Sequence, residues 1–203
     1  GRLELAYVQM EGFTADVAHE LCTPLATLIS STELALRKAR DATELREVLG
    51  SNLEELQRVA SIVHDMLFLS QADRGVIARR VPTTSLAALA LQVCNYHEAA
   101  LEDAGLALEI VGDASGSFDT PLLQRALSNL VGNATRYAQR GSTVRVEIIQ
   151  SAPGEVQLQV VNRGTAIEPS HLPRLFDRFY RGDPSRSHAD RNHGLGLAIV
   201  AAI

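Results

Sequence analysis

Residues 122–137 read Leu122-Leu-Gln-Arg-Ala-Leu-Ser-Asn129-Leu-Val-Gly-Asn133-Ala-Thr-Arg136-Tyr137. We predict a helix over residues 120–138, with Thr120 as its N-cap and Pro121 in its first turn. Asn129, Asn133 and Arg136 then lie on one face of the helix, at i, i+4 and i+7. Neutral amide oxygens beside a cation suit a Mg²⁺ ion that takes most of its ligands from phosphate and water. The alternative is an ordinary solvated helix face.

Strand-like segments lie on both sides of this helix. Residues 106–111 form a short apolar run, and residues 143–149 and 156–161 alternate in the manner of half-buried strands. The last two are joined through Pro153 and Gly154, which predicts an antiparallel hairpin. Residues 85–104 have the pattern of a further helix. Helices mixed with an antiparallel sheet predict an α+β sandwich.

The first 72 residues have a different character, with a single proline and no strand-like run. Their apolar side chains recur in steps of three and four, which predicts two amphipathic helices. The two stripes consist of Val17, Leu21, Leu25, Leu28, Thr32 and Ala35, and of Leu45, Val48, Leu49, Leu56, Val59, Val63, Met66 and Leu67. A polar break over residues 40–43 separates the helices, and Asp41 or Thr43 can cap the second. Such an antiparallel hairpin cannot cover its own stripe, so we expect a dimer that forms a four-helix bundle.

The overall composition excludes several classes of protein. The 203 residues are 46% hydrophobic, carry a net charge of −5 and contain no basic block, so a nucleic-acid partner is not expected. The two cysteines lie far apart, which predicts free thiols in a reducing compartment. No apolar run of about 18 residues and no signal peptide are present. Any membrane span of a parent protein would therefore lie outside this piece.

One histidine lies in an unusual setting in the first helix, within Phe13-Thr-Ala-Asp-Val-Ala-His19-Glu20-Leu-Cys-Thr23-Pro24-Leu25. His19 lies beside the apolar stripe and should point to solvent. The neighbouring carboxylate of Glu20 can hold the imidazole in the tautomer that leaves one nitrogen nucleophilic. Thr23 shares the face of His19 and could position a water molecule. The alternative is a solvated surface histidine on a kinked helix.

Three further motifs follow the sheet. Asn162-Arg-Gly164-Thr-Ala166-Ile167 comes directly after a strand and is a polar turn able to approach a flat ligand. Leu175-Phe-Asp-Arg-Phe-Tyr-Arg181 supplies aromatic packing, and residues 182–193 are polar and aperiodic, as in a mobile lid. Gly194-Leu195-Gly196-Leu197 begins a helix whose free backbone amides can face phosphate. Each motif alone is a weak signal.

The order and spacing of these motifs resemble the sensor histidine kinases over essentially the whole chain. Residues 1–75 resemble the dimerisation and histidine-phosphotransfer hairpin. Residues 76–203 resemble the catalytic ATP-binding domain with the Bergerat fold of gyrase, Hsp90 and MutL. Ser51-Asn-Leu-Glu-Glu-Leu and Asp65-Met-Leu-Phe-Leu-Ser-Gln-Ala-Asp, together with Leu172-Pro-Arg-Leu-Phe-Asp-Arg-Phe-Tyr-Arg, resemble the branch that answers copper, silver, cobalt or zinc. The expected fold is thus an all-α hairpin followed by an α+β Bergerat-type sandwich, with its C-terminal end missing because relatives continue beyond Ile203.

The resemblance implies the chemistry. His19 is the phosphoacceptor, Glu20 a general base or orienter, and Thr23 the residue that orients water when the regulator is dephosphorylated. ATP and Mg²⁺ are the implied cofactors, with Asn133 as the metal ligand. The implied nucleotide-binding residues are Asn129, Asn133, Arg136, Tyr137, Asn162, Gly164, Ala166, Ile167, Gly194, Leu195, Gly196 and Leu197. Asn162 replaces the usual aspartate and Ala166 a usual glycine, so we expect weakened nucleotide binding.

The resemblance also implies partners and a location. The chain should form a homodimer through the hairpin and receive a response regulator near His19, Ala26, Thr27, Ser30 and Ser31. It would be the cytoplasmic portion of a bacterial inner-membrane protein, reaching the membrane only through segments absent here. Two other functions remain as alternatives. One is a Bergerat-fold ATPase that hydrolyses ATP to drive conformational change, and the other is a non-catalytic or phosphatase-biased pseudokinase scaffold.

Overall fold

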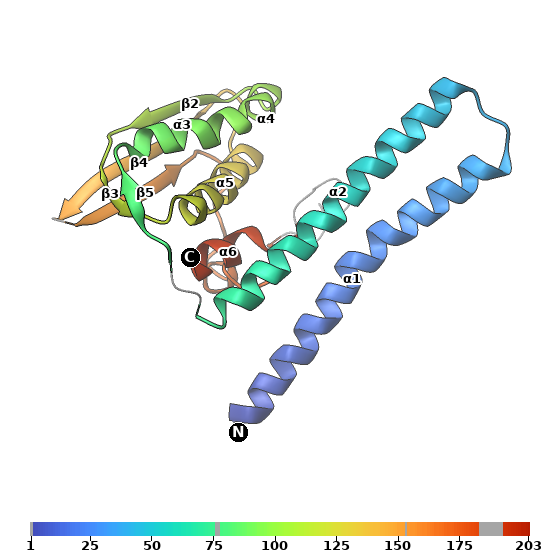
Figure 1. Cartoon of the computed structure of the whole chain (residues 1–203), viewed down its shortest axis with the longest axis horizontal. Helices are drawn as coiled ribbons and strands as arrows, with labels where there is room; N and C mark the ends of the chain where they lie inside the picture. The colour runs from blue at the N-terminus through green and yellow to red at the C-terminus, as the bar shows by residue number, and fades with distance from the viewer. Residues whose placement is uncertain (1, 76–77, 153, 183–192) are drawn as a thin grey trace. The chain divides into compact units, whose positions relative to one another are not determined.

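A helical hairpin precedes a set of short helices and strands in the computed structural model (Figure 1). The structure describes residues 2–75, 78–152, 154–182 and 193–203. These residues form two compact units. The first contains the chain up to Ser70 together with Arg178–Leu195, and the second contains Gln71–Asp177 together with Gly196–Ile203. The predicted combination of an α-hairpin with an α/β unit is confirmed.

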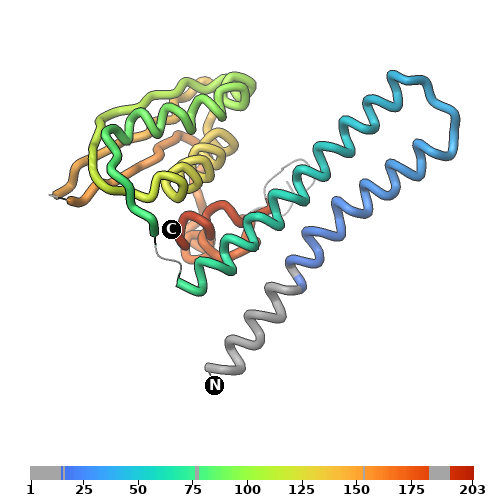
Figure 2. The backbone as a smooth tube through the Cα atoms, viewed as in Figure 1, coloured from blue at the N-terminus to red at the C-terminus, as the bar shows by residue number. Residues whose placement is uncertain are grey.

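The hairpin consists of α1 (Arg2–Arg37) and α2 (Ala42–Ala72), which are the two longest helices in the tube view (Figure 2). Asp41 caps α2, because its Oδ1 atom accepts from the backbone N–H groups of Thr43 and Glu44, each at 2.8 Å. A side-chain hydrogen bond joins the two helices: Asn52 Nδ2 donates to Thr32 Oγ1 at 3.0 Å. Of the two predicted caps, the structure uses Asp41.

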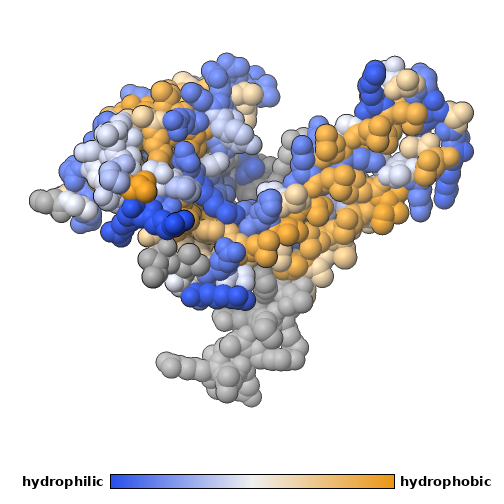
Figure 3. All heavy atoms as spheres, in the orientation of Figure 1, coloured by the Kyte–Doolittle hydropathy of each residue, from blue (hydrophilic) through white to orange (hydrophobic). Residues whose placement is uncertain are grey.

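The hairpin buries only part of its apolar surface. Leu28, Ile62 and Leu69 are buried, as is Pro24 inside α1. Many other apolar side chains of the helices remain exposed, among them Leu49 at 66%. Figure 3 shows them as a hydrophobic band along the hairpin. A large contiguous apolar surface is typical of an interaction face.

The second unit contains two sheets and the helices that cover the larger one. Its elements are β1 (Val81–Thr83), α3 (Leu86–Tyr96), α4 (Glu98–Asp103), β2 (Ala107–Val111), β3 (Gly116–Phe118), α5 (Thr120–Tyr137), β4 (Thr143–Ala152), β5 (Glu155–Val161), the 3₁₀ turn η1 (Leu172–Arg174) and α6 (Gly196–Ala202). β4 and β5 pair antiparallel, as predicted. β2 pairs with β4 in parallel, so the predicted antiparallel sheet is in fact mixed, in the order β2-β4-β5.

One face of this sheet is packed and the other is polar. Val144, Val146 and Ile148 alternate along β4 and are buried. Val146 and Ile148 share a core with side chains of α3 and α5, including Leu127 and Val131. On the outer face Arg145 forms a 2.8 Å ion pair with Glu109 of the neighbouring strand. The period-two pattern therefore directs one row of side chains of β4 toward the helices.

Two local predictions were wrong, and one small sheet was missed. The helix expected over residues 85–104 is interrupted at His97, so that α3 and α4 are separate. The N-cap of α5 is Asp119 and not Thr120, because the Asp119 carboxylate accepts from the N–H of Leu122. The small antiparallel sheet of β1 and β3 was not predicted, since each strand has only three residues and Val81 pairs with the distant Phe118.

Two absences concern the described residues alone. Within them no helix is both long and apolar enough to cross a membrane. Cys22 and Cys94 are free thiols, the first exposed and the second buried, in agreement with the prediction. Burial raises the pKa of the Cys94 thiol.

Candidate functional site

His19, Glu20 and Thr23 lie within little more than one turn of α1 in the first unit. The side chain of His19 is exposed, as predicted, whereas Glu20 is half-buried. Thr23 Oγ1 donates to the backbone carbonyl of His19 at 3.1 Å. This bond uses the hydroxyl proton but leaves the oxygen able to accept a hydrogen bond from water. The exposed imidazole is therefore open to a reactant approaching from solvent.

Glu20 contacts a residue far along the chain. Its Oε2 atom lies 3.4 Å from Nδ1 of His193, which belongs to the same unit. This contact lowers the pKa of the Glu20 carboxyl, burial opposes the effect, and Arg181 and Arg58 add to the lowering. The Glu20 side chain is consequently held as a carboxylate at neutral pH.

The predicted docking residues follow His19 along α1. Ala26, Thr27 and Ser30 are exposed, and Ser31 is half-buried. Thr27 Oγ1 donates to the carbonyl of Thr23 at 3.2 Å, so its side chain lies along the helix surface. The surface beyond His19 thus presents small side chains.

The polar face of α5 is present in the second unit. Asn129, Asn133 and Arg136 are all half-buried. Arg136 donates to Oδ1 of Asn133 at 3.4 Å, which shows that these two side chains share a face. Asn129 Nδ2 donates to the carbonyl of Arg125 at 3.0 Å. Its Oδ1 atom lies beside Gly196 of α6, where an added Cβ would come within 2.8 Å.

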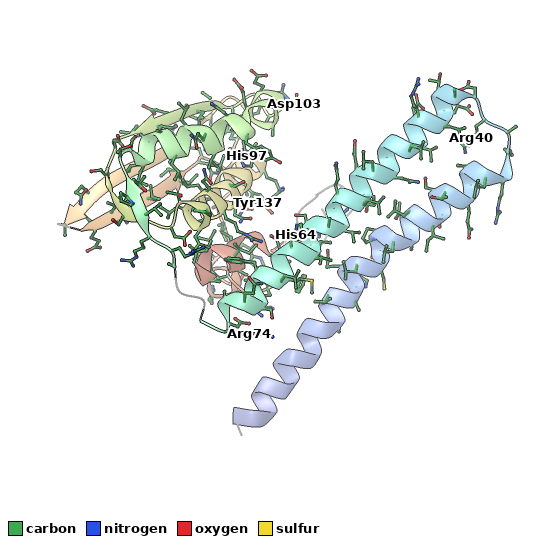
Figure 4. The ribbon with its side chains drawn as sticks, in the orientation of Figure 1. Arg40, His64, Arg74, His97, Asp103 and Tyr137 are labelled. Atoms are coloured by element: carbon green, nitrogen blue, oxygen red, sulfur yellow. The ribbon has the colours of Figure 1, made fainter. Side chains whose placement is uncertain are left out.

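The C-terminal end of α5 adjoins the turn that follows β5. Figure 4 shows Tyr137 at this end of the helix, and this residue is 51% exposed. Gly164 forms an isolated bridge with Ala138. A Cβ on Gly164 would lie 2.1 Å from the carbonyl oxygen of Tyr137, so only glycine fits at this position. Asn162 is half-buried, with Nδ2 3.4 Å from the same Cβ position.

The remaining predicted nucleotide-binding residues differ in their exposure. Ala166 and Ile167 are exposed. Leu195 is buried and Leu197 half-buried. Most of the polar stretch predicted as a lid, residues 183–192, lies outside the described residues.

Gly194 packs against Phe179, which belongs to the aromatic motif of residues 175–181. Its φ is 69°, and its carbonyl accepts from the N–H of Phe179 at 3.0 Å. A Cβ on Gly194 would lie 2.7 Å from the backbone of Phe179, so glycine is required for both its conformation and its packing. Phe179 itself has a φ of 61°, which is uncommon for a residue with a side chain.

Sequence reasoning missed two histidines. His193 was assigned only to the polar stretch, and no periodic signal links it to Glu20. His97 lies between α3 and α4 (Figure 4), where its Nε2 atom is 2.9 Å from the hydroxyl of Ser128 on α5. Burial lowers the pKa of His97, and its ring lies 3.6 Å from the Cβ position of Gly132. His97 therefore packs against α5 at Ser128 and Gly132. In the sequence, the break between α3 and α4 would have been the only signal for this histidine.

The donor set along α5 suits phosphate-bound Mg²⁺. The amide oxygen of Asn133 is neutral and has a second lone pair beyond its bond with Arg136. Among the residues that the structure describes, no group of three or more His, Cys, Asp or Glu could hold a metal ion. A site with one amide ligand fits a hard cation that takes its other ligands from water and phosphate oxygens.

Two domain families match the chain. Residues 9–75 match the His Kinase A (phospho-acceptor) domain. Residues 118–203 match the Histidine kinase-, DNA gyrase B-, and HSP90-like ATPase family. A phosphoacceptor hairpin followed by an ATPase domain of this kind characterises the sensor histidine kinases, and the chain belongs to that family.

Within the family, the similarity to heavy-metal sensor kinases is confirmed. The chain is 48% identical over 203 residues to the sensor histidine kinase CusS of Escherichia coli (strain K12), covering 100% of this chain and 42% of that protein. It is 41% identical over 198 residues to the sensor protein CopS of Pseudomonas syringae pv. tomato, covering 98% of this chain and 40% of that protein. The chain therefore spans less than half the length of these relatives.

The fold also matches a solved structure. The histidine kinase AdeS of Acinetobacter baumannii superposes with a TM-score of 0.73 at 22% identity, covering 91% of this chain and 84% of that one. At this identity the match concerns the fold alone.

Proposed function

We propose that this chain is the kinase core of a sensor histidine kinase, which phosphorylates its own His19 from ATP and passes the phosphoryl group to an aspartate of a response regulator. The single observation that carries the proposal is the exposed His19, flanked by Glu20, in a hairpin that matches the phosphoacceptor family. Asn129 and Asn133 of α5, with Gly164 and Gly196 beside this helix, would bind the ATP that supplies the phosphoryl group. Residues 1–75 would be the phosphotransfer hairpin and residues 76–203 the catalytic domain.

The first step is phosphoryl transfer to the imidazole. One ring nitrogen of His19 forms a bond to the γ-phosphorus of ATP, while the bond to the bridging oxygen breaks and the electron pair leaves on ADP. The proton on the other ring nitrogen is oriented, or accepted, by the carboxylate of Glu20. Because such transfer depends on positioning and charge neutralisation, the protein needs no covalent chemistry beyond the nucleophile.

The nucleotide would lie along α5. Asn162, Gly164 and Tyr137 would contact the adenine. Gly164 packs closely on Tyr137 and has no side chain, so only backbone lies between a ligand and that end of α5. The remaining nucleotide contacts are assigned to Asn129, Arg136, Ala166, Ile167, Gly194, Leu195, Gly196 and Leu197. Asn133 would be the protein ligand of Mg²⁺, which when bound neutralises charge on the phosphates.

The partners follow from the hairpin. The exposed leucines of α1 and α2 support a homodimer in which two hairpins form a four-helix bundle. The small side chains at Ala26, Thr27, Ser30 and Ser31 would receive the response regulator beside His19. The water-positioning role of Thr23 would serve dephosphorylation of the regulator, and is supported by the free acceptor capacity of its hydroxyl.

The signal and the location are inferred from the resemblance to heavy-metal sensor kinases. The parent protein would respond to a metal ion through a domain outside this chain. The chain would lie on the cytoplasmic side of a bacterial inner membrane. Similarity to CusS and CopS over nearly the whole chain supports this assignment.

The test is incorporation of γ-labelled phosphate from Mg·ATP into the natural full-length protein, its His19→Gln variant and this 203-residue chain. We expect an acid-labile, alkali-stable label in the natural protein and none in His19→Gln. Nucleotide binding and ATP hydrolysis without any label would instead favour the ATPase. Regulator binding with no nucleotide binding would favour the pseudokinase scaffold.

A further inference from the structure

His193 is the one polar side chain in the buried class among the residues that the structure describes. Its side chain is only 7% exposed, and Nδ1 lies 3.4 Å from Oε2 of Glu20, whose side chain is 23% exposed. A carboxylate can only accept, so Nδ1 must carry the hydrogen, in a bond longer than the usual range of about 2.7–3.2 Å. Buried polar groups are normally hydrogen-bonded, and Glu20 is the partner found for this one.

The surroundings of Glu20 are basic on two sides. Arg181, from the same segment as His193, and Arg58, from α2, both act on the Glu20 carboxylate. Arg58 also lies 3.6 Å from Glu55, so part of its charge is already compensated. The carboxylate is therefore a favourable anchor for a neighbouring N–H donor.

The residue that follows His193 restricts its backbone as well. The next residue, Gly194, accepts a hydrogen bond from the N–H of Phe179. Its Cα packs so tightly on Phe179 and Tyr180 that no Cβ would fit. His193 thus has little freedom to leave Glu20 while this pairing persists.

We propose that His193 is a positioning residue, which anchors the start of the Gly194-Leu195-Gly196 phosphate loop on Glu20, one residue from the phosphoacceptor His19. The inference rests on the proposed function. A group held near its reaction partner reacts faster because less translational and rotational freedom is lost on the way to the transition state. His193 acts on the rate of transfer, and the nucleotide is held by other residues.

The kinetic test compares His193→Leu with His193→Asn in the natural full-length protein. Asn keeps an N–H donor near the place of Nδ1, whereas Leu has a similar size and no donor. At saturating ATP, we expect His193→Leu to form phospho-His19 about tenfold more slowly, the effect of losing one charge-assisted hydrogen bond. The KM for ATP should stay unchanged, and His193→Asn should recover most of the rate.

A double variant shows whether His193 acts through Glu20. If it does, His193→Leu combined with Glu20→Ala should be no slower than Glu20→Ala alone. Independent losses that multiply would overturn the inference, as would a His193→Leu rate equal to that of the natural protein. A tenfold rise in KM with an unchanged rate would also overturn it, because His193 would then serve nucleotide binding.

A second readout does not depend on activity. Hydrogen exchange of the backbone amides at residues 194–197 should become faster in His193→Leu and in Glu20→Ala, and should stay slow in His193→Asn. If the natural protein takes up no label, the proposed function fails, but the exchange pattern still decides whether His193 is anchored on Glu20. Unchanged exchange in both variants overturns the inference while labelling of His19 leaves the kinase function intact.

Discussion

Gly164 approaches Tyr137 so closely that a Cβ on the glycine would lie 2.1 Å from the tyrosine carbonyl oxygen. This contact fixes the turn after β5 to the end of α5. We expect Gly164→Ala to force the two backbones apart, destabilising the fold by about 1–3 kcal/mol and abolishing nucleotide binding. Gly50→Ala is the matched control, because nothing lies within 4 Å of its Cβ position on α2. Thermal unfolding and binding of a fluorescent ATP analogue measure both effects, and equal behaviour of the two variants would contradict the assignment.

Gly196→Ala should behave differently. The added Cβ would meet Oδ1 of Asn129 at 2.8 Å, and this atom is the far end of a side chain that can move. We expect little change in the melting temperature and a loss of nucleotide affinity of about tenfold, since the displaced amide would leave its place in the proposed phosphate site. Titration with a non-hydrolysable ATP analogue measures the affinity. A large loss of stability with normal affinity would show that Asn129 is purely structural.

Asp113 should make the second unit sensitive to acid. Its Oδ1 atom accepts from the N–H groups of Ala87 and Ala114, at 2.9 and 2.8 Å. These and neighbouring bonds, led by that from Ala87, lower its pKa from the ordinary 3.8. A lowered pKa in the folded state means that the ionised group stabilises the fold above the ordinary pKa and loses that effect as the pH falls through the lower, folded value.

Asp113→Asn should therefore reduce the free energy of unfolding at about pH 7, and the difference from the natural protein should shrink as the pH falls through the lowered pKa of Asp113. Urea unfolding at a series of pH values from neutral into the acid range measures it. A difference that persists unchanged in acid would mean that the charge of Asp113 contributes nothing.

The exposed leucines of α2 should control dimerisation. Leu56 is 52% exposed in the single chain, and by symmetry a dimer would bury it twice. We expect Leu56→Lys to raise the dissociation constant of the dimer by about a hundredfold or more. Gln57→Lys adds the same charge at the next, polar and exposed position and should have little effect. Sedimentation equilibrium distinguishes the two, and equal dissociation constants would place the dimer contact elsewhere.

The features that could be predicted from the sequence depend on neighbours along the chain. The two long helices and the β4–β5 hairpin follow from periodicity over a few residues, and the shared face of Asn133 and Arg136 follows from helical spacing. Features set by distant pairing were not predicted. The contact of Glu20 with His193 spans 173 positions, and no repeat, cap or turn in either segment requires it.

The small misassignments have the same cause. Asp119 and Thr120 are both good N-cap residues, and only the direction of the chain entering α5 decides between them. Phe179, with its positive φ, donates its N–H to Gly194, which lies beyond the polar stretch. Such choices depend on the path of the backbone on either side of the residue, and a short stretch of sequence does not contain this information.

The parallel pairing of β2 with β4 makes α5 the crossover connection between two neighbouring strands. The β4–β5 hairpin can form early from nearby residues, but β2 and β4 can pair only after the chain between them has closed into a loop that contains all of α5. We therefore expect the helix with the asparagines to pack into place late, when the sheet is complete. A nucleotide that binds along α5 would recognise the finished topology, and nascent chains should acquire ATP affinity in one cooperative step.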